Sequence, residues 1–504
     1  MSVVCRTLVV DDAGLDELRR PRHDLLREVA DGPDAFACAT GPFERYRRTL
    51  TVVDAGDGGH RVEERIEFRT AIRYWRWLLH LPVRRRLRRP GTSTPWWAPP
   101  DALDAQAAVA LSTLTIVSII GGYLSTLIGQ TMTFAADEFG SSERLQGFSL
   151  GAVRIGALIA LAMVAVADRR GRRLVIVAAC ALGIVTSATG ALAPDLTTLT
   201  ISQIVGRSFA TTLVILVPIL AAEEMPAGSR AYALGLLAMS SSLGSGFAVM
   251  ALPLADLDER GWRLIYLVPL LGLPIVRDVW RNLPESRRYV AHAADRPERV
   301  QLGQYRGRLI LLAVTGFLLN TFVAPAAQFR NRFLDDERGF SGSEISAFIL
   351  LTSTPAGIGV VAGSLLADRW ARRPVAAIGF TASAVLTAAF FLSDGLGLWF
   401  FALSGTILGA LAVPAFKVYE PEMFPTRLRS RANGIITAVT LGGSVTGLVV
   451  TGLLTEPIGG LGRALAVVCV GGLAASLLIL LRFPETAREE LEDINPADRR
   501  ASPE

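Results

Sequence analysis

The chain has 504 residues, of which 51% are hydrophobic, and its mean hydropathy is +0.40. This composition is too apolar for an ordinary soluble protein of this length, so soluble globular classes are excluded. The net charge of +5 does not predict nucleic-acid binding, because the arginines stand in the loops between apolar runs, where membrane topology needs them.

Residues 1–106 form an N-terminal extension that is charged and has no long apolar run. Apolar and polar residues alternate over Arg45–Val53 and over Arg61–Thr70, with turn residues between them, which predicts a β-hairpin. Asp16–Ala30 is predicted to be helical, with a break at Pro21. We therefore expect a small α+β extension.

An aromatic stretch, Tyr74–Leu81, precedes the basic run Arg84–Arg89 and the pair Trp96 and Trp97. This order is typical of an interfacial segment that binds anionic lipid headgroups through its arginines. One alternative is that the arginines only hold the first membrane helix in its orientation. Another is a folded module that binds a lipid or a metabolite.

The chain from Ala107 to Pro484 is a series of apolar runs, each long enough to cross the hydrocarbon core as a helix of about 20 residues. The sixth run is the weakest, because Pro269 and Pro274 interrupt it. We expect an all-α membrane protein with eleven or twelve spans, and twelve is favoured. The spans begin near Ala108, Gly147, Leu174, Thr198, Ala231, Trp262, Leu309, Glu344, Pro374, Leu396, Ala432 and Leu461.

Arginine-rich loops follow the even-numbered spans, whereas the loops after odd-numbered spans are short, polar or acidic. Basic loops stay in the cytoplasm, so both termini are expected to be cytoplasmic and the chain to be a multi-pass protein of the cytoplasmic (inner) membrane. We predict six-helix halves at 107–281 and 309–484, a central cytoplasmic linker at 282–308 and a cytoplasmic tail at 485–504.

One loop pattern occurs twice, each time between two long apolar runs. The first copy contains Asp168, Arg169, Gly171, Arg172 and Arg173, and the second contains Asp368, Arg369, Arg372 and Arg373. Further along each half stands a second pair of charged groups, Glu224 with Arg230 and Glu422 with Arg427. A membrane protein whose halves share loop chemistry at matching places is most economically two related helical bundles, which is a transporter architecture.

The repeated loop resembles the signature of the major facilitator superfamily. The resemblance covers about residues 107 to 486 and extends to Leu283-Pro-Glu285-Ser-Arg287 and Phe483-Pro-Glu-Thr486, which resemble the sugar-porter and organic-ion branches. It implies twelve helices in two halves, with the loop charges acting as latches during alternating access. The alternative is that these charges only set topology.

The second copy of the repeated loop differs more from the family pattern than the first copy does. The glycine usual four residues before the aspartate is Val164 in the first copy and Ser364 in the second. Ala371 also replaces the loop glycine of the second copy. The role of the second loop as a gate is therefore less well supported.

The span interiors contain no aspartate or glutamate by these boundaries, but they contain Arg154, Arg207 and Lys417. Ionisable groups at lipid depth are costly and are functional by default. Arg207 lies near mid-membrane in the fourth span, which the resemblance places at the cavity, so Arg207 is the first candidate for binding an anion. The alternative is a structural arginine bonded to carbonyls of the next helix. Arg154 is a second candidate, and Lys417 is a third unless it snorkels to the cytoplasm.

Uncharged polar residues on the other expected cavity helices, the first and the seventh spans, could bind a substrate or join helices. The candidates are Tyr123, Thr126 and Gln130 in the first span, and Asn320, Thr321 and Gln328 in the seventh. The first span has no carboxylate. Proton coupling then depends on glutamates at the cytoplasmic ends or on the substrate, or is absent.

The four histidines lie outside the spans without metal-ligand spacing, and no phosphate-binding glycine loop is present, so we expect no enzyme, metal or cofactor. We predict a secondary transporter of a small organic solute, with an organic anion or metabolite slightly favoured, that works as a monomer and is possibly driven by protons. The alternatives are a membrane-embedded sensor on a transporter scaffold and a drug efflux antiporter.

Overall fold

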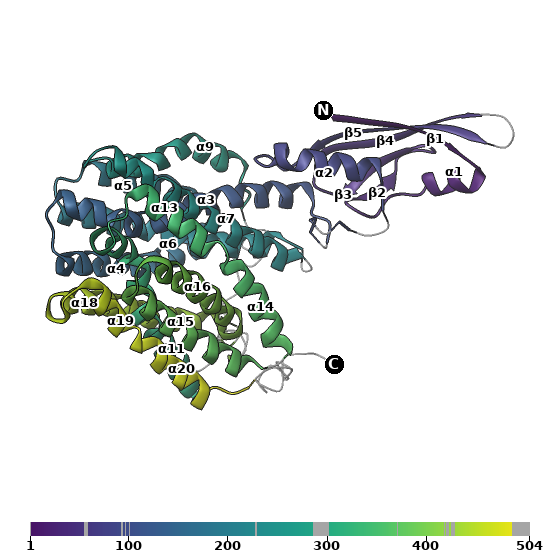
Figure 1. The fold of residues 1–504 in the computed structure, drawn as a ribbon. Helices are drawn as coiled ribbons and strands as arrows, with labels where there is room; N and C mark the ends of the chain where they lie inside the picture. Colours follow the sequence, from purple (N-terminus) through teal and green to yellow (C-terminus); the bar gives the residue numbers. More distant parts are fainter. Residues whose placement is uncertain are drawn as a thin grey trace.

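The computed structural model of the chain consists of an N-terminal sheet unit and a body of long helices (Figure 1). It describes residues 2–54, 59–91, 94–95, 97–99, 101–226, 229–285, 302–369, 371–417, 419, 423–424 and 429–485. The helices of the body run side by side, and the sheet unit projects from one end of them.

The sheet unit has, among the described residues, five antiparallel strands in the order β1-β5-β4-β3-β2. The strands are β1 (Ser2–Val10), β2 (Arg27–Ala30), β3 (Ala35–Thr40), β4 (Phe43–Asp54) and β5 (His60–Thr70). Strands β4 and β5 pair along their length, with Leu50 opposite Glu64. The predicted hairpin is thus confirmed, and it forms part of a larger sheet.

The helix predicted over Asp16–Ala30 is confirmed only for Asp16–Leu18 and is wrong beyond Leu18. Helix α1 spans Asp12–Leu18 and ends before Pro21, which cannot continue a helix. The chain then becomes strand β2, because the carboxylate of Glu28 is buried and accepts hydrogen bonds from other parts of the sheet unit. This tertiary contact is invisible to local helix propensity.

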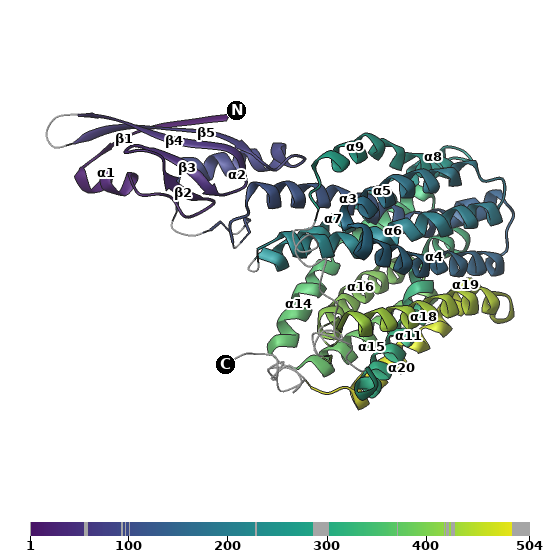
Figure 2. The ribbon, with the colours of Figure 1, turned by 180° about the vertical axis from the view of Figure 1, so that it is seen from behind.

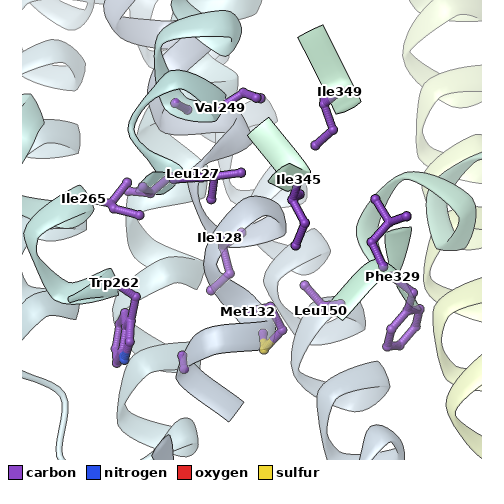
Figure 3. Packing of buried hydrophobic residues seen from close by; sticks show 14 of the residues in the cluster. Leu127, Ile128, Met132, Leu150, Val249, Trp262, Ile265, Phe329, Ile345 and Ile349 are labelled. Carbon is purple, nitrogen blue, oxygen red and sulfur yellow. The ribbon is translucent and has the colours of Figure 1, made fainter. Parts of the chain in front are cut away.

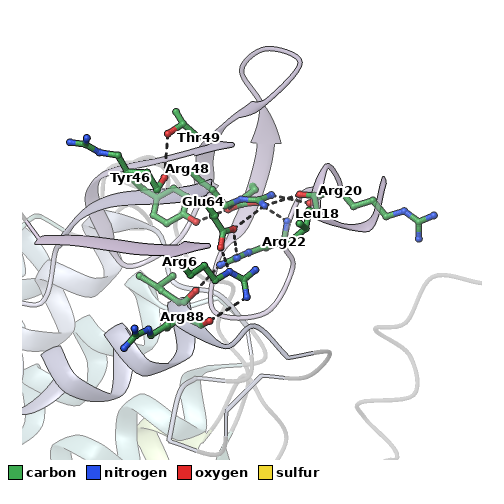
Figure 4. Close-up of polar contacts among 12 residues, drawn as sticks. Arg6, Leu18, Arg20, Arg22, Tyr46, Arg48, Thr49, Glu64 and Arg88 are labelled. Carbon is green, nitrogen blue, oxygen red and sulfur yellow. Dashed lines mark hydrogen bonds and ion pairs between the residues drawn. The ribbon is translucent and has the colours of Figure 1, made fainter. Parts of the chain in front are cut away.

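A buried charged network holds the sheet unit together (Figure 4). Arg48 on β4 is 1% exposed, and its guanidinium pairs with Glu28 at 2.7 Å and with Glu64 at 3.3 Å. Arg22 pairs with the same Glu64 carboxylate at 2.5 Å. The hydroxyl of Tyr46 donates to Glu28, and burial beside that carboxylate raises the pKa of Tyr46 far above its ordinary value. Buried charges are tolerated when they are paired in this way, so the extension is a folded unit with its own interior.

Helix α2 (Arg76–Arg88) contains most of the predicted basic aromatic segment. Its Val83 and Leu87 pack against the sheet, and Arg86 pairs with Asp24 at 2.9 Å. Trp77 and Leu81 remain exposed on the helix, at 74% and 58%. Their spacing of one helical turn gives α2 an apolar stripe that faces away from the sheet.

Eleven helices among the described residues are long and apolar enough to cross a membrane, which agrees with the predicted eleven or twelve spans. In the first half they are α3 (Ala105–Glu138), α4 (Glu143–Arg170), α5 (Arg172–Ala188), α6 (Leu196–Glu224) and α7 (Arg230–Met250). In the second half they are α11 (Arg306–Gln328), α13 (Gly342–Ser353) with α14 (Ala356–Arg369), α15 (Arg372–Leu392), α16 (Gly395–Lys417), α18 (Arg429–Ile458) and α19 (Leu461–Val468) with α20 (Val470–Arg482).

The sixth predicted span is divided into shorter pieces. They are α8 (Trp262–Leu267), the 3-10 turn η4 (Val268–Gly272) and α9 (Leu273–Asn282). Pro269 stands at the start of η4 and Pro274 at the start of α9. A proline removes a backbone donor at each of these points, which explains why the segment is not one continuous helix.

Among the described residues, the two halves share a buried apolar core at only one end of the body. In Figure 3, Leu127, Ile128 and Val249 from the first half lie next to Ile345 and Ile349 from the second, within one buried cluster. The other two large clusters of the body contain no residue of the opposite half. We call the end with the shared core the closed end, and the end with the two repeated loops the arginine-rich end.

The sheet unit is fixed to the first half at the arginine-rich end (Figure 2). Arg73 and Tyr74 both bond the carboxylate of Asp278 on α9, at 2.8 and 2.6 Å. The indole of Trp75 donates to the hydroxyl of Thr115 on α3 at 2.7 Å. All these partners belong to the first half, so the extension is attached to that half by side-chain hydrogen bonds.

Candidate functional site

A cavity of about 180 Å³ lies between the two halves, midway along their helices. Helices α4 and α6 line it from the first half, and α11 and α18 line it from the second. Its polar lining residues are Arg154, Thr211, Asn320, Thr437, Thr440 and Ser444. Two of the predicted substrate contacts, Arg154 and Asn320, thus line the same cavity from the two halves.

Arg207 lies beside this cavity, one turn before Thr211 on α6. Its Nη1 donates to the carbonyl oxygen of Ser125 on α3, which is the contact that a structural arginine would make. Its Nε is buried and has no partner among the described residues. Arg154 is near enough for the two guanidinium charges to repel each other, and no described carboxylate lies close to either one. Two adjacent cations at this depth favour an anionic ligand.

The other predicted cavity residues have different positions. The hydroxyl of Tyr123 donates to the carbonyl oxygen of Ile265 at 2.8 Å, inside the first half. Asn320 accepts a hydrogen bond from Ser444 at 3.2 Å in the cavity wall. Lys417 is exposed as the last residue of α16, at the arginine-rich end.

Gln130 and Gln328 lie at the closed end rather than at the cavity. The side-chain amide of Asn331 donates to the carbonyl oxygen of Gln130 at 2.8 Å and to its Oε1 at 3.0 Å. Gln328 packs against Gly129, where a Cβ would come within 2.1 Å of its Oε1. Gln130 therefore joins α3 of the first half to Asn331 just after α11, and Gln328 joins the end of α11 to the same helix α3.

Ion pairs and helix caps also connect the halves at the closed end. Arg332, in the short helix α12 (Arg330–Arg332), pairs with Asp137 at the end of α3. The carboxylate of Asp256 accepts from the backbone amides of Gly342 and Ser343 at 2.7 and 2.8 Å. These amides are the free donors at the start of α13, so an acidic group of one half caps a helix of the other.

A cluster of carboxylates surrounds Arg332 at this end. Asp335 and Asp336, in the π-helical turn η6 (Phe333–Glu337), place their oxygens within 4.8 Å of those of Asp137. Partial burial, together with the negative charge of Asp137, raises the pKa of each of the two to about 6, although Arg332 opposes the shift. The closed end therefore holds two carboxyl groups whose pKa values lie near 6.

Helices α4 and α18 cross with their backbones in contact near the closed end. A Cβ on Gly147 would lie 2.8 Å from the carbonyl oxygen of Leu448, and one on Gly452 would lie 2.9 Å from that of Glu143. Only glycine allows so close an approach of two helices. One turn along α4, Gly151 has ordinary space, with its nearest neighbour at 3.4 Å.

The first repeated loop is capped by the motif that follows the sixth span. Gly171 has a φ of +95°, and a Cβ there would meet the carboxylate of Glu285 at 2.5 Å, so the position requires glycine. Glu285 Oε1 accepts from the backbone amides of Arg172 at 2.9 Å and Arg173 at 3.3 Å. The guanidinium of Arg172 pairs with Glu223, and that of Arg173 lies over the ring of Trp280.

The second repeated loop has the same cap in the other half. The carboxylate of Glu485 accepts from the amides of Arg372 at 2.9 Å and Arg373 at 3.1 Å. The separation in sequence between cap and amide is 113 residues in both halves. Ala371 has a φ of −166°, which is extended backbone open to any residue. The missing glycine therefore does not prevent the second loop from making this contact.

Among the remaining predicted residues, the structure describes the side chain of Glu224. Glu224 is buried at 4% exposure and accepts from Gln106 at 3.2 Å. Arg287, Glu422 and Arg427 lie outside the described residues. The side chains of Asp168, Arg169, Asp368, Arg369 and Arg230 also lie outside what the structure describes.

Sequence reasoning did not identify the contacts of the closed end or the two caps. Asp137, Asp256 and Asp335 belong to loops that the sequence identifies only as short, polar or acidic, and no sequence pattern singles out Asn331 or Arg332. One signal was available for the caps, because Glu285 and Glu485 stand at the same distance from their loops in each half. No local pattern indicates the cross-half pairs, because their partners are distant in sequence.

Two similar helical halves, joined at one end around a polar cavity, define a membrane transporter that opens its ends in turn. The Major Facilitator Superfamily model matches residues 113–329 and 309–502, so the chain belongs to that family. It is therefore a multi-pass membrane protein and a secondary transporter of small solutes, not an enzyme.

Relatives and solved structures agree with this assignment. The arabinose-proton symporter of Bacillus subtilis is 23% identical over 75% of this chain and 91% of its own length. The niacin transporter of Acinetobacter baylyi is 26% identical over 69% of this chain and 85% of its own. The fold is similar to that of the E. coli xylose transporter in an inward-open conformation, with a TM-score of 0.64, 16% identity, and coverage of 77% of this chain and 98% of that one.

Proposed function

We propose that this transporter moves a small organic solute that has a carboxylate, and that Arg154 binds the carboxylate in the cavity with Arg207 beside it. The observation that supports this most is the pair of neighbouring guanidinium groups with no described carboxylate close to them. An anionic substrate would supply the missing counter-charge and satisfy the buried Nε of Arg207. The similar niacin transporter acts on a carboxylic acid by its name, which supports the same chemistry.

The neutral polar wall of the cavity completes the proposed site. Asn320 and Ser444 on the second half are already bonded to one another, and they lie opposite Arg154. A solute that bonds both walls would draw the halves together. This fits alternating access, in which binding energy is used to change the relation of the two halves.

We also propose that the arginine-rich end faces the cytoplasm, with both termini on that side of the cytoplasmic membrane, and that a monomer is the working unit. The positive-inside rule supports this orientation. The similarity to an arabinose-proton symporter supports proton coupling, with the acidic cluster of the closed end and Glu223 as candidate groups. In this orientation the structure is closed to the outside.

The proposal is tested by electrical recordings from proteoliposomes on a solid-supported membrane. Pools of organic carboxylates, sugars and organic cations are applied in turn to the wild type and to the Arg154→Gln, Arg207→Gln and Arg144→Gln variants. Arg144 lies on α4 outside the cavity and serves as the matched control.

We expect currents from carboxylates, with a half-saturating concentration about 10- to 100-fold higher in Arg154→Gln, because a charge-assisted bond is lost. Arg207→Gln should show a similar loss, and Arg144→Gln should match the wild type. Currents from sugars alone, or carboxylate currents that survive both cavity substitutions, would overturn the assignment of the substrate.

A further inference from the structure

An apolar groove of about 440 Å³ lies where the extension meets the first half, apart from the central cavity. One wall belongs to the body and the other to the extension. The apolar residues that matter here are Trp75, Leu78 and Trp97 from the extension, and Leu111, Met239 and Leu243 from α3 and α7.

The groove extends to the depth of the hydrocarbon core and is accessible from the lipid side. Met239 lies roughly 14 Å along α7 from its first residue. Leu78, Met239 and Leu243 line the groove and are nevertheless 52%, 65% and 44% exposed. Such a surface on a membrane span is in contact with lipid, so an occupant of the groove comes from the bilayer.

Exposed arginines of α2 stand close to the end of the groove next to the sheet unit, outside its lining. Val83 of α2 lines the groove there, and the exposed Arg84 and Arg85 follow it directly on the helix. Asp24, the one carboxylate in the lining, is paired with Arg86 at 2.9 Å. Exposed arginines on α2 therefore stand beside an apolar trough, which matches a ligand with an acyl chain and an anionic head.

We propose that this groove is a binding site for one anionic phospholipid, with an acyl chain between α3, α7 and the extension and with the headgroup at Arg84 and Arg85. The extension is bonded to the first half through Asp278 and Thr115. A lipid in the groove therefore fills the space between the extension and its half and stabilises their docked arrangement. This role is separate from solute binding in the central cavity.

The site is tested by native mass spectrometry of the full chain released from nanodiscs of phosphatidylglycerol or phosphatidylcholine. Met239→Trp fills the groove with a larger side chain. Met250→Trp is the matched control, because Met250 is 58% exposed on the same helix outside the groove. A third variant, Arg84→Gln with Arg85→Gln, removes the charge of the rim.

We expect the wild type and Met250→Trp to retain one phosphatidylglycerol after mild delipidation, and Met239→Trp to retain it at least tenfold less. The double arginine variant should lose the preference for phosphatidylglycerol over phosphatidylcholine. Quenching of tryptophan fluorescence by brominated acyl chains gives a second readout in the wild-type fold, and Trp75→Phe should reduce it. Equal retention in the two tryptophan variants, or no retained phospholipid in the wild type, would overturn the proposal.

Discussion

At the scale of single residues, Arg154 and Arg207 show how much the sequence alone can predict about a charged residue inside a membrane span. Their presence in apolar runs predicts a functional site, and the structure brings the two together beside the cavity. The sequence ranks Arg207 ahead of Arg154, but the order depends on which face of α4 and α6 meets the second half, which no local pattern indicates. Arg154 lines the cavity, whereas Arg207 also bonds Ser125 of its own half.

The glycine contact between α4 and α18 gives a prediction at this scale. Alanine at Gly147 would place a Cβ 2.8 Å from the Leu448 carbonyl, a backbone atom that cannot move alone, so the closed end should be forced apart. We expect Gly147→Ala to slow transport at least tenfold, measured as initial uptake in proteoliposomes.

Gly151→Ala is the matched control for this substitution. It lies one turn away on α4, and its added Cβ makes only ordinary contact. Both changes raise helix propensity by up to about 1 kcal/mol, so a stability effect alone would appear in both variants. Equal uptake by the two would show that the close crossing is not needed for closure.

At the scale of elements, the two loops and their caps form a repeat that is clearer in the structure than in the sequence. Glu285→Gln and Glu485→Gln each remove a negative charge from a helix N-terminus while keeping one acceptor. We expect each to lower the free energy of unfolding by about 1 kcal/mol, to a similar extent in the two halves. Thermal unfolding in detergent measures this, with the exposed Glu259→Gln as the control. If only one of the two variants lost stability, the two caps would not contribute equally to the stability of their halves.

Helices and strands that depend on neighbouring residues in the sequence could be predicted, whereas those that depend on distant residues could not. Long apolar runs define the spans, and alternation identifies the β4–β5 hairpin. The predicted helix over Asp16–Ala30 fails beyond Leu18, because β2 is held by the buried Glu28 and its partners Tyr46 and Arg48 on β4. The additional strands of the extension and the cross-half contacts of Asn331 likewise depend on residues far away in the chain.

At the scale of the whole molecule, the structure represents one state of a two-state cycle. The closed end is held shut by the shared apolar core, by the ion pair of Arg332 with Asp137, and by the bond from the amide of Gly342 to Asp256. At the arginine-rich end, the apolar clusters of the two halves remain separate. A transporter must also populate the opposite state. The free-energy difference between the state with this end shut and the state with it open then depends on the groups that are in contact only in the shut state.

The acidic cluster predicts how pH shifts this balance. The pKa values of Asp335 and Asp336 are about 6 in the shut end, against an ordinary value of 3.8 in an open, solvated one. The shut end therefore binds protons more tightly. Proton binding to this pair therefore stabilises the shut state fully below about pH 3.8, and this stabilisation is lost as the pH rises through about 6.

The charged groups that face the pair are Arg332, Asp137, Asp256 and Glu143. Replacing both aspartates by asparagine should remove this dependence, and Glu259→Gln should not.

The measurement that tests alternating access most directly is electron–electron double resonance between spin labels on the two halves in nanodiscs. One pair, Leu192 with Leu396, reports on the closed end, where both side chains are exposed, at 81% and 88%. A second pair, Arg281 with Leu481, reports on the arginine-rich end. The exposed Cys5 and the half-buried Cys38 are replaced by serine so that only the introduced labels react.

We expect two distances for each pair, with the populations changing in opposite directions at the two ends. Lowering the pH from 7.5 to 5 should favour the shorter distance for Leu192 with Leu396 and the longer one for Arg281 with Leu481. A single unchanged distance at both ends, or ends that open and close together, would contradict a transporter that alternates between its two halves.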